Sequence, residues 1–394
     1  MISKDLDNIE LGDLQALVDD SVREDRTIEF KQHLPGAQDG ERKEFLADVT
    51  SFANAIGGDL IYGIAERREE GRPTAVADSL DGIGDGNPDA ERLRLENMLR
   101  DGVAPRLPNV RTKLIDGGRN GPLLVIRIPQ SWDSPHMVTF KDWNRFYSRN
   151  DGGKQLLDVF EIRRSFLAAG ELADRIRQFR VSRLGSIVAR DTPVAIPATG
   201  AIVHLIPYSA FRSTQSVDVR RAAAAGDGML SPLSPSSYNL RYNIDGLVTF
   251  DGDARESYSY FQLFRNGIIE TVDGTALSPT GPAAQNGLAS TAFTRDLFAF
   301  VGRAFALYPK LDVQPPVALL VTLIGAKDAV LPARDWYRRH GTFDRDVIQL
   351  PDVVVDDFSC DLRATLRPAL DALWQAAGLE RCTKYDENGQ WIEG

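Results

Sequence analysis

The sequence predicts an α/β domain followed by an α+β domain. The chain has 394 residues, which is more than one average domain contains. Residues 24–66 place a strand-like segment, an amphipathic helix and a second strand in succession, an order typical of α/β domains. The later half instead gathers short strand-like segments ahead of its helices, which favours an α+β domain. We expect the first domain at residues 1–185, a linker at 186–200, and the second domain at 201–394.

The first elements are predicted by the spacing of apolar residues. Leucines and valines at helical steps predict an N-terminal helix over residues 11–22. A short strand follows, in which alternation puts Ile28 and Phe30 on one face and Glu29 and Lys31 on the other. A carboxylate and an ammonium therefore share one side of this strand.

The segment 41–58 predicts a helix that ends at a double glycine. Its apolar residues follow steps of three and four: Phe45, Val49, Phe52, Ala53 and Ile56. Gly57 can adopt the left-handed conformation that ends a helix, and Gly58 lets the chain turn into a strand over residues 59–66. We expect Glu66 to end that strand.

Weaker patterns predict the remaining elements. In the first domain we expect a loop to Pro88, a helix at 90–100, strands at 123–128 and 143–148, and helices at 158–169 and 172–184 separated by Gly170. In the second domain we expect strands at 201–206, 239–244, 247–250, 258–264, 268–272 and 317–324, with helices at 294–308 and 362–377.

The composition is that of an ordinary globular protein, in which acidic and basic residues are concentrated in different parts of the chain. The formal net charge is −10, which argues against non-specific coating of nucleic acid. Residues 161–190, however, carry seven arginines against three acidic residues. No apolar run is long enough to span a bilayer, the N-terminus is unlike a secretory signal, and the two cysteines, Cys360 and Cys382, lack zinc-ligand spacing. We expect a cytoplasmic protein.

Two stretches of the chain resemble a known family. The pattern E-x4-E-F-K, followed by S-F-A-N-A-x-G-G-x-L-I-x-G-I-x-E, resembles the AlbA-type domain of Schlafen proteins and their bacterial relatives. The segments 128–137 and 145–149 are similar to the later part of that domain. The resemblance covers roughly residues 20–170 and implies an AlbA-like fold for the first domain.

The resemblance also implies an activity. Some Schlafen-type domains are metal-dependent endoribonucleases that act on transfer RNA or other structured RNA through three acidic residues. By position these residues are Glu24, Glu29 and Glu66, where the family usually has Asp at the third place. Carboxylate oxygens suit Mg²⁺ or Mn²⁺, and Lys31 would stabilise charge developing on phosphate. The residues alone leave another reading open, in which Glu29 and Lys31 form an ion pair and Glu24 caps a turn.

The double glycine has two interpretations. Asn54, Gly57 and Gly58 could bind a nucleotide, since glycines let backbone N–H groups approach an anion and relatives are often labelled ATP-binding. In the other interpretation Asn54 braces the turn and both glycines serve the corner between helix and strand. Gly152-Gly153-Lys154 lacks the surrounding residues of a phosphate-binding loop, so we do not expect a Walker-type ATPase.

A later segment predicts contact with nucleic acid. Basic residues there alternate with aromatic ones, and the predicted contacts are His136, Lys141, Arg145, Tyr147, Arg149 and Lys154. The alternatives are a half-buried strand with Phe146 inward, and a structural role for His136.

These observations lead to one main hypothesis. We expect a Mg²⁺- or Mn²⁺-dependent endoribonuclease that acts on tRNA-like RNA, and the resemblance implies a role in antiphage or stress defence. Schlafen proteins use two AlbA-type lobes and this chain shows one, so we expect a homodimer. The alternative is a non-catalytic regulator that binds RNA, DNA or ATP.

Overall fold

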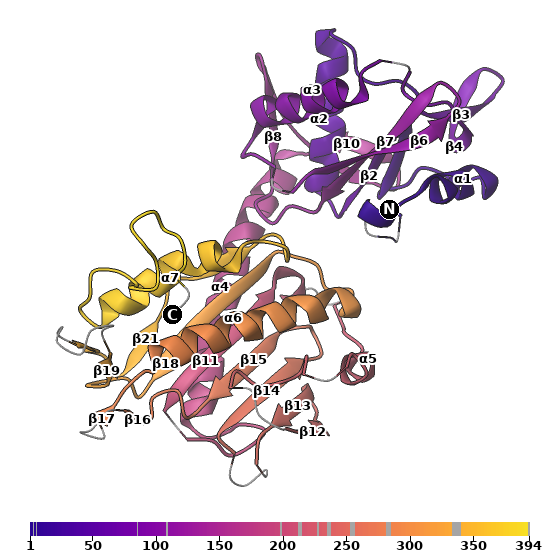
Figure 1. Cartoon of the computed structure of the whole chain (residues 1–394). Helices are drawn as coiled ribbons and strands as arrows, with labels where there is room; N and C mark the ends of the chain where they lie inside the picture. Colours follow the sequence, from indigo (N-terminus) through magenta and orange to yellow (C-terminus); the bar gives the residue numbers. More distant parts are fainter. Residues whose placement is uncertain are drawn as a thin grey trace. The chain divides into compact units, whose positions relative to one another are not determined.

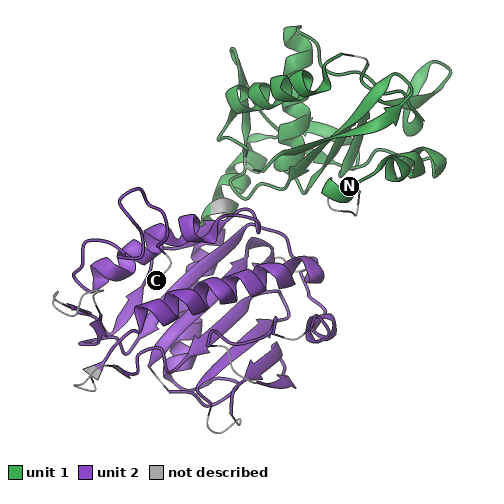
Figure 2. Ribbon diagram, viewed as in Figure 1, with its two compact units in different colours: residues 1–171 green, residues 172–394 purple. Residues whose placement is uncertain are grey.

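A computed structural model shows that the chain divides into two compact units, residues 1–171 and 172–394 (Figure 2). The structure describes all residues except 3, 5, 85, 108, 198, 212–214, 227, 235–237, 253–256, 281–284, 333–339 and 393–394, and the side chains of 169, 280 and 285. The division falls within one long helix, α4 (Val159–Val188). The sequence prediction of two helices separated by Gly170 is therefore wrong, because a single glycine costs a helix only about 1 kcal/mol and does not end it.

The central sheet of unit 1 has four strands in the order β1-β2-β7-β6, of which β2, β7 and β6 are labelled in Figure 1. Its strands are β1 (Ile28–Lys31), β2 (Gly57–Tyr62), β7 (Gly121–Pro129) and β6 (Arg111–Gly118). β1 and β2 are parallel, and helix α2 (Asp39–Ala53) connects them. The β–α–β order expected from residues 24–66 is confirmed for these three elements.

Each face of this sheet packs on a separate apolar cluster. Phe45, Val49 and Phe52 of α2 pack with Leu60 of β2 on one face. Ile28 and Phe30 of β1 pack on the other face, which α1 (Leu11–Asp19) covers. The predicted alternation is confirmed, so Glu29 and Lys31 point to the α2 side of the sheet.

The other elements of unit 1 form a second sheet and a hairpin. The second sheet has the order β10-β9-β8-β5, formed by Gly153–Leu156, Trp143–Asn150, Met137–Phe140 and Val103–Ala104. The hairpin pairs β3 (Ile64–Glu69) with β4 (Arg72–Leu80). The helices are η1 (Leu6–Asn8) and α3 (Pro88–Gly102).

The structure corrects two details of the predicted β–α–β segment. Helix α2 ends at Ala53, and Ile56 is exposed instead of belonging to the apolar stripe. The strand expected over residues 59–66 is two strands, because Gly63 at φ +93° lets the chain leave the central sheet and enter the hairpin. Glu66 therefore lies within β3, and the expected loop to Pro88 contains β4.

Unit 2 is built on an antiparallel sheet. The strand order is β12-β13-β14-β15-β11-β18-β21, and β22 also pairs with β18. The strands are Asn239–Tyr242, Gly246–Phe250, Ser259–Phe264, Ile269–Asp273, Gly200–Pro207, Val317–Ile324 and Val347–Gln349, with β22 at Val353–Val355. Helices α6 (Ser290–Leu307) and α7 (Leu362–Ala376) pack on one face of the sheet (Figure 1). The C-terminal part of α4 packs on the other face.

A buried ionic network attaches α4 to the sheet within unit 2. The Glu270 carboxylate accepts hydrogen bonds from Arg183 at 2.9 Å through both oxygens, from His204 at 2.9 Å and from Tyr260 at 2.7 Å. Burial alone would raise the pKa of Glu270, but the Arg183 and His204 partners outweigh it and lower the pKa to about 2. The carboxylate is therefore ionised and fully paired in the interior.

Short elements complete unit 2. They are η2 (Tyr208–Phe211), α5 (Val219–Ala223), β16 (Pro279–Thr280), β17 (Gln285–Asn286), η3 (Tyr308–Leu311), β19 (Val330–Leu331) and β20 (Gly341–Thr342). No helix in the described parts of the chain is both long enough and apolar enough to cross a membrane.

Candidate functional site

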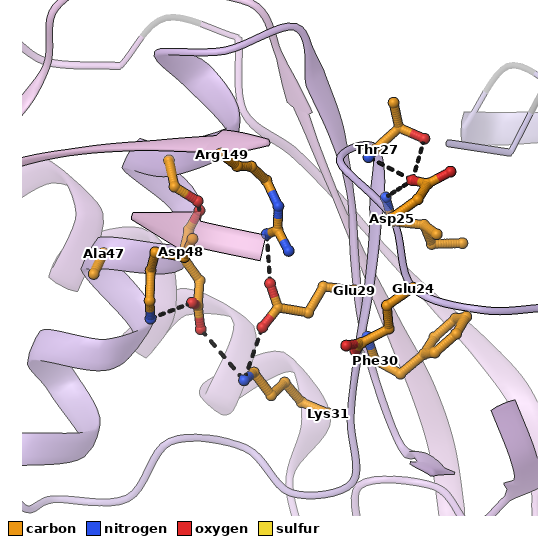
Figure 3. Close-up of polar contacts among 12 residues, drawn as sticks. Glu24, Asp25, Thr27, Glu29, Phe30, Lys31, Ala47, Asp48 and Arg149 are labelled. Atoms are coloured by element: carbon orange, nitrogen blue, oxygen red, sulfur yellow. Dashed lines mark hydrogen bonds and ion pairs between the residues drawn. The ribbon is translucent and has the colours of Figure 1, made fainter. Parts of the chain in front are cut away.

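Charged side chains meet where β1 faces α2. The Lys31 ammonium lies 2.8 Å from Glu29 Oε1 and 3.7 Å from Asp48 Oδ2. Figure 3 shows this ammonium between the two carboxylates. Glu29 and Lys31 share one face of β1 because they are two residues apart, and Asp48 lies on the buried face of α2.

Two cations from the second sheet extend this arrangement. Arg149 of β9 forms an ion pair with Glu29 Oε2 and places its guanidinium over the Phe52 ring, 4.0 Å from the centroid. Lys154 of β10 lies 2.5 Å from Asp48 Oδ1. The five alternating charges Arg149, Glu29, Lys31, Asp48 and Lys154 are called the buried charge chain below. They leave Glu29 with a cation on each oxygen.

Glu24 and Glu66 lie next to this chain. Glu24 precedes β1, and its Oε1 accepts a hydrogen bond from the Phe30 amide at 2.6 Å. Glu66 Oε2 accepts one from the Ala75 amide at 3.1 Å. Burial first, and then the charges of Glu29 and Glu66, raise the pKa of Glu24 to about 7, and the Phe30 amide only partly opposes this shift. The three glutamates therefore interact electrostatically.

The pKa values within the charge chain follow from burial and pairing. Burial would raise the pKa of Glu29, but Lys31 and Arg149 outweigh it, so the pKa is lowered. For Lys31, burial is outweighed by Asp48 and Glu29, and the pKa is raised. Burial and the Glu29 charge raise the pKa of Asp48 to about 6, against the effect of the two lysines. Glu29 and Lys31 are thus both charged at neutral pH.

The carboxylates around Glu24 match a hard divalent cation in ligand type. Among the hydrogen bonds of the described residues, one oxygen of Glu24 and one of Glu66 lack a partner. Carboxylate oxygens are the ligands that Mg²⁺ and Mn²⁺ prefer, and a cation would relieve the repulsion that raises the Glu24 pKa. In this structure, however, no group of three or more His, Cys, Asp or Glu side chains among the described residues lies close enough together to hold a metal ion.

Comparison with known proteins identifies the region that contains these residues. The family model described as "Schlafen, AlbA_2" matches residues 24–158. Residues 24–158 are thus similar to a Schlafen AlbA_2 domain, and this region is called the AlbA_2 domain below. The resemblance inferred from the sequence motifs is thereby confirmed for this part of the chain.

Other comparisons add little to this identification. No curated protein matches the chain significantly. A solved structure that resembles part of the chain is the solution NMR structure of the N-terminal domain of a RecG-related protein from Nitrosomonas europaea. The two share 24% identity with a TM-score of 0.23, over 29% of this chain and 71% of the other.

The AlbA_2 domain also carries an exposed aromatic and basic surface on β9. Trp143 is 37% exposed, and its indole N–H donates to the Tyr147 hydroxyl at 3.1 Å. Lys43 Nζ lies 4.9 Å from the ring centroid and the Arg145 guanidinium 5.3 Å. We call Lys43, Trp143, Arg145 and Tyr147 the tryptophan platform. Arg145 and Tyr147 were predicted from the sequence as contacts for nucleic acid, and the structure brings them together.

The other predicted contacts lie elsewhere. His136 is buried, with Nδ1 2.7 Å from the Pro105 carbonyl and Nε2 2.5 Å from the Ser131 hydroxyl, and burial lowers its pKa. Arg149 and Lys154 belong to the buried charge chain, and Lys141 pairs with Asp39. These placements do not suit a direct contact of His136 or Arg149 with nucleic acid.

The double glycine of the AlbA_2 domain faces protein atoms. A Cβ on Gly57, which has φ +77°, would lie 2.7 Å from the Gln130 amide nitrogen. A Cβ on Gly58 would overlap the Phe52 ring. The Asn54 amide donates to the carbonyls of His136 and Tyr147 at 2.8 Å each. These residues form a packed corner, as the structural interpretation of the sequence described, and leave little room for a nucleotide.

Asp48 was not predicted from the sequence as a site residue. Arg149 was predicted to contact nucleic acid, whereas the structure pairs it with Glu29. Asp48 lies three residues after Phe45 and four before Phe52, on the apolar stripe of α2. A carboxylate on such a stripe needs a buried partner, so its position was a usable signal. Arg149 had no such signal, because its neighbour Glu29 is 120 residues away along the chain.

Proposed function

We propose that the AlbA_2 domain binds nucleic acid and cleaves RNA with the help of Mg²⁺ or Mn²⁺. The observation that supports this most directly is the Lys31 ammonium 2.8 Å from Glu29 Oε1, with Glu24 held next to this pair by the Phe30 amide. Burial and the charges of Glu29 and Glu66 raise the pKa of Glu24, which is consistent with this arrangement. Three carboxylates that repel one another beside a charged lysine have the composition of a metal-assisted phosphodiester site. The family of the domain supports nucleic acid as the ligand.

Each residue has a distinct part in this proposal. Glu24 and Glu66 each have a carboxylate oxygen available for a cation, and Glu29 contributes the third charge. The metal, when bound, would polarise the phosphate and lower the pKa of water. Lys31 stays protonated between Glu29 and Asp48, so it can stabilise negative charge on the phosphate. Arg149 pairs with the other oxygen of Glu29, Oε2, and so fixes the orientation of the Glu29 side chain.

The finer features of the function follow from the family resemblance. We propose tRNA-like structured RNA as the substrate, action as a homodimer in the cytoplasm, and a role in antiphage or stress defence. Size-exclusion chromatography with light scattering checks the dimer, and a strict monomer at micromolar concentration would contradict it.

The pairing of Glu29 with two cations favours a second function. Both oxygens of Glu29 already have a cationic partner, Lys31 on one and Arg149 on the other. A carboxylate neutralised in this way is a poorer metal ligand. The domain would then bind RNA or DNA without cutting it, as a regulator.

Cleavage of labelled total tRNA by the purified full-length protein tests the proposal. The protein is incubated with Mn²⁺, with Mg²⁺ or with EDTA, beside Glu24→Gln and the double variant Glu24→Gln, Glu29→Gln. Glu69→Gln is the matched control, because Glu69 lies on the same hairpin as Glu66 but is exposed. We expect metal-dependent cutting by the wild type and the control, and none by either site variant.

The outcomes separate the two functions. Cutting that survives in Glu24→Gln would exclude this site. If no condition gives cutting while RNA is still shifted on a native gel, the non-catalytic function is correct. RNA binding that persists in EDTA and weakens with salt would support that second outcome.

A further inference from the structure

The tryptophan platform has a composition that suits one kind of ligand. Trp143 is among the exposed large apolar residues of unit 1, although an indole of this size is usually covered in a globular domain. It lies at the start of β9, where the β8–β9 hairpin turns. The exposed ring therefore needs an explanation beyond packing.

The ring is held in place from within the domain. Its indole N–H donates to the Tyr147 hydroxyl four residues along the same strand. Tyr147 is itself anchored, because its carbonyl accepts the Asn54 amide and its ring packs against the core of α2 and β2. Such a rigid ring loses little entropy when a flat ligand stacks on it.

Two cations accompany the ring without a direct ion pair to a carboxylate among the described residues. In the described part of the chain, Lys43 and Arg145 form no ion pair with a carboxylate, whereas neighbouring Lys141 pairs with Asp39. Both cations instead lie against the Trp143 ring. They are therefore available to an incoming anion at little cost.

We infer that the tryptophan platform binds an unpaired nucleobase, with Lys43 and Arg145 contacting the phosphates beside it. A free anion would use the cations but not the indole, and an apolar peptide would use the indole but not the cations. A single-stranded nucleotide uses both, through its flat base and its flanking phosphates. Bases inside a duplex are covered on both faces, so the platform selects loops or single strands.

This inference rests on the proposed binding of nucleic acid and specifies which part of the RNA is recognised. It predicts that the protein prefers an RNA hairpin with an open loop over a blunt duplex with the same stem. The preference should depend on the aromatic face of residue 143.

The test measures binding of two fluorescent RNAs, the hairpin and the blunt duplex, to full-length protein in EDTA at one fixed salt concentration. Trp143→Ala should weaken hairpin binding by about 5-fold or more, the range expected for loss of one base stack, and leave duplex binding unchanged. Trp143→Phe should retain most of the affinity. Phe160→Ala, which removes an exposed aromatic of α4, is the matched control and should change neither.

The possible outcomes separate the base-stacking inference from the proposed binding of nucleic acid. Equal loss for both RNAs, or loss for neither, would overturn the base-stacking inference while leaving nucleic-acid binding intact. Failure of the wild type to bind either RNA would overturn the proposed function and the inference with it. If circular dichroism shows that Trp143→Ala is unfolded, Trp143→Leu against Trp143→Phe gives the same contrast, since Leu keeps apolar packing without a flat face.

Discussion

Glu24 is a carboxyl group whose pKa of about 7 makes the stability of the AlbA_2 domain depend on pH. The cause is burial first, followed by the charges of Glu29 and Glu66. Since the folded-state pKa is raised, the folded protein holds a proton that the unfolded chain has already lost at pH values between the two pKa values. The contribution of Glu24 to stability is therefore largest at low pH and falls as pH rises toward about 7.

Glu24→Gln should remove this pH dependence. The amide oxygen of Gln can still accept the Phe30 N–H, while the buried charge is gone. We expect the variant to be more stable than the wild type at pH 8 by about 1–3 kcal/mol, and similar to it near pH 4.5. Urea unfolding at both pH values measures this difference in stability. Asp48 is present in both proteins, so its own contribution to the pH dependence cancels in the comparison. Parallel pH profiles for the two proteins would show that Glu24 is not the group that titrates.

A divalent cation should stabilise the wild type through the same carboxylate. At pH 7.5 without RNA, we expect Mn²⁺ to raise the Tm of unit 1 in the wild type and in Glu69→Gln, but not in Glu24→Gln. Differential scanning calorimetry provides the measurement. An equal rise in all three proteins would indicate binding elsewhere on the surface.

Among the elements, the corner between α2 and β2 is the most constrained. Gly58 has the Phe52 ring on one side and the Thr27 carbonyl oxygen 2.5 Å from where a Cβ would lie. This close approach lets β2 begin directly beside β1.

Gly58→Ala should destabilise unit 1 by about 1–3 kcal/mol, the usual cost of forcing an extra group into a packed interior. The matched control is Gly40→Ala near the start of α2, where a Cβ would meet nothing within 4 Å. We expect the control to be neutral or slightly stabilising, because Ala favours a helix more than Gly does. Thermal unfolding followed by circular dichroism compares them, and equal stability of the two variants would contradict this account of the corner.

The elements that could be predicted from the sequence are those with a strong apolar period. The stripe of α2 and the alternation at Ile28 and Phe30 fixed both the helix and the face of β1 that carries Glu29. The β3–β4 hairpin was missed because β3 is rich in charged residues and β4 contains a proline and mostly small residues, so no apolar alternation marked either strand. Arg149 could be predicted as a strand residue but not as a partner of Glu29, since local spacing carries no information on distant contacts.

At the scale of the whole molecule, the two units have separate cores. The apolar clusters of unit 1 contain residues up to Tyr147, and those of unit 2 begin at Leu172. We therefore expect each unit to unfold in its own transition, so that a single two-state Tm would not describe the protein.

Glu270→Gln tests this independence. Removing the charge leaves the partly buried Arg183 and the buried His204 with a weaker partner, so the transition of unit 2 should lose about 3–5 kcal/mol. The transition of unit 1 and its affinity for RNA should not change. Calorimetry measures the two unfolding transitions, and gel shifts measure the affinity for RNA. Asp312→Asn, which removes an exposed ion pair with Arg221, is the control and should cost less than about 1 kcal/mol. A shift of both transitions in Glu270→Gln would show that the units unfold cooperatively.

The buried charge chain also has a consequence during protein synthesis. Glu29, Lys31 and Asp48 are made early, but Arg149 and Lys154, which complete the chain, are translated only after about a hundred further residues. Until then Glu29 lacks the cation that pairs its second oxygen, and Asp48 lacks its closest one. In a nascent chain on the ribosome, the carboxylates of Glu29 and Asp48 are therefore present before the cations that complete their pairing. The order of translation delays completion of the site until the second sheet of the domain has emerged.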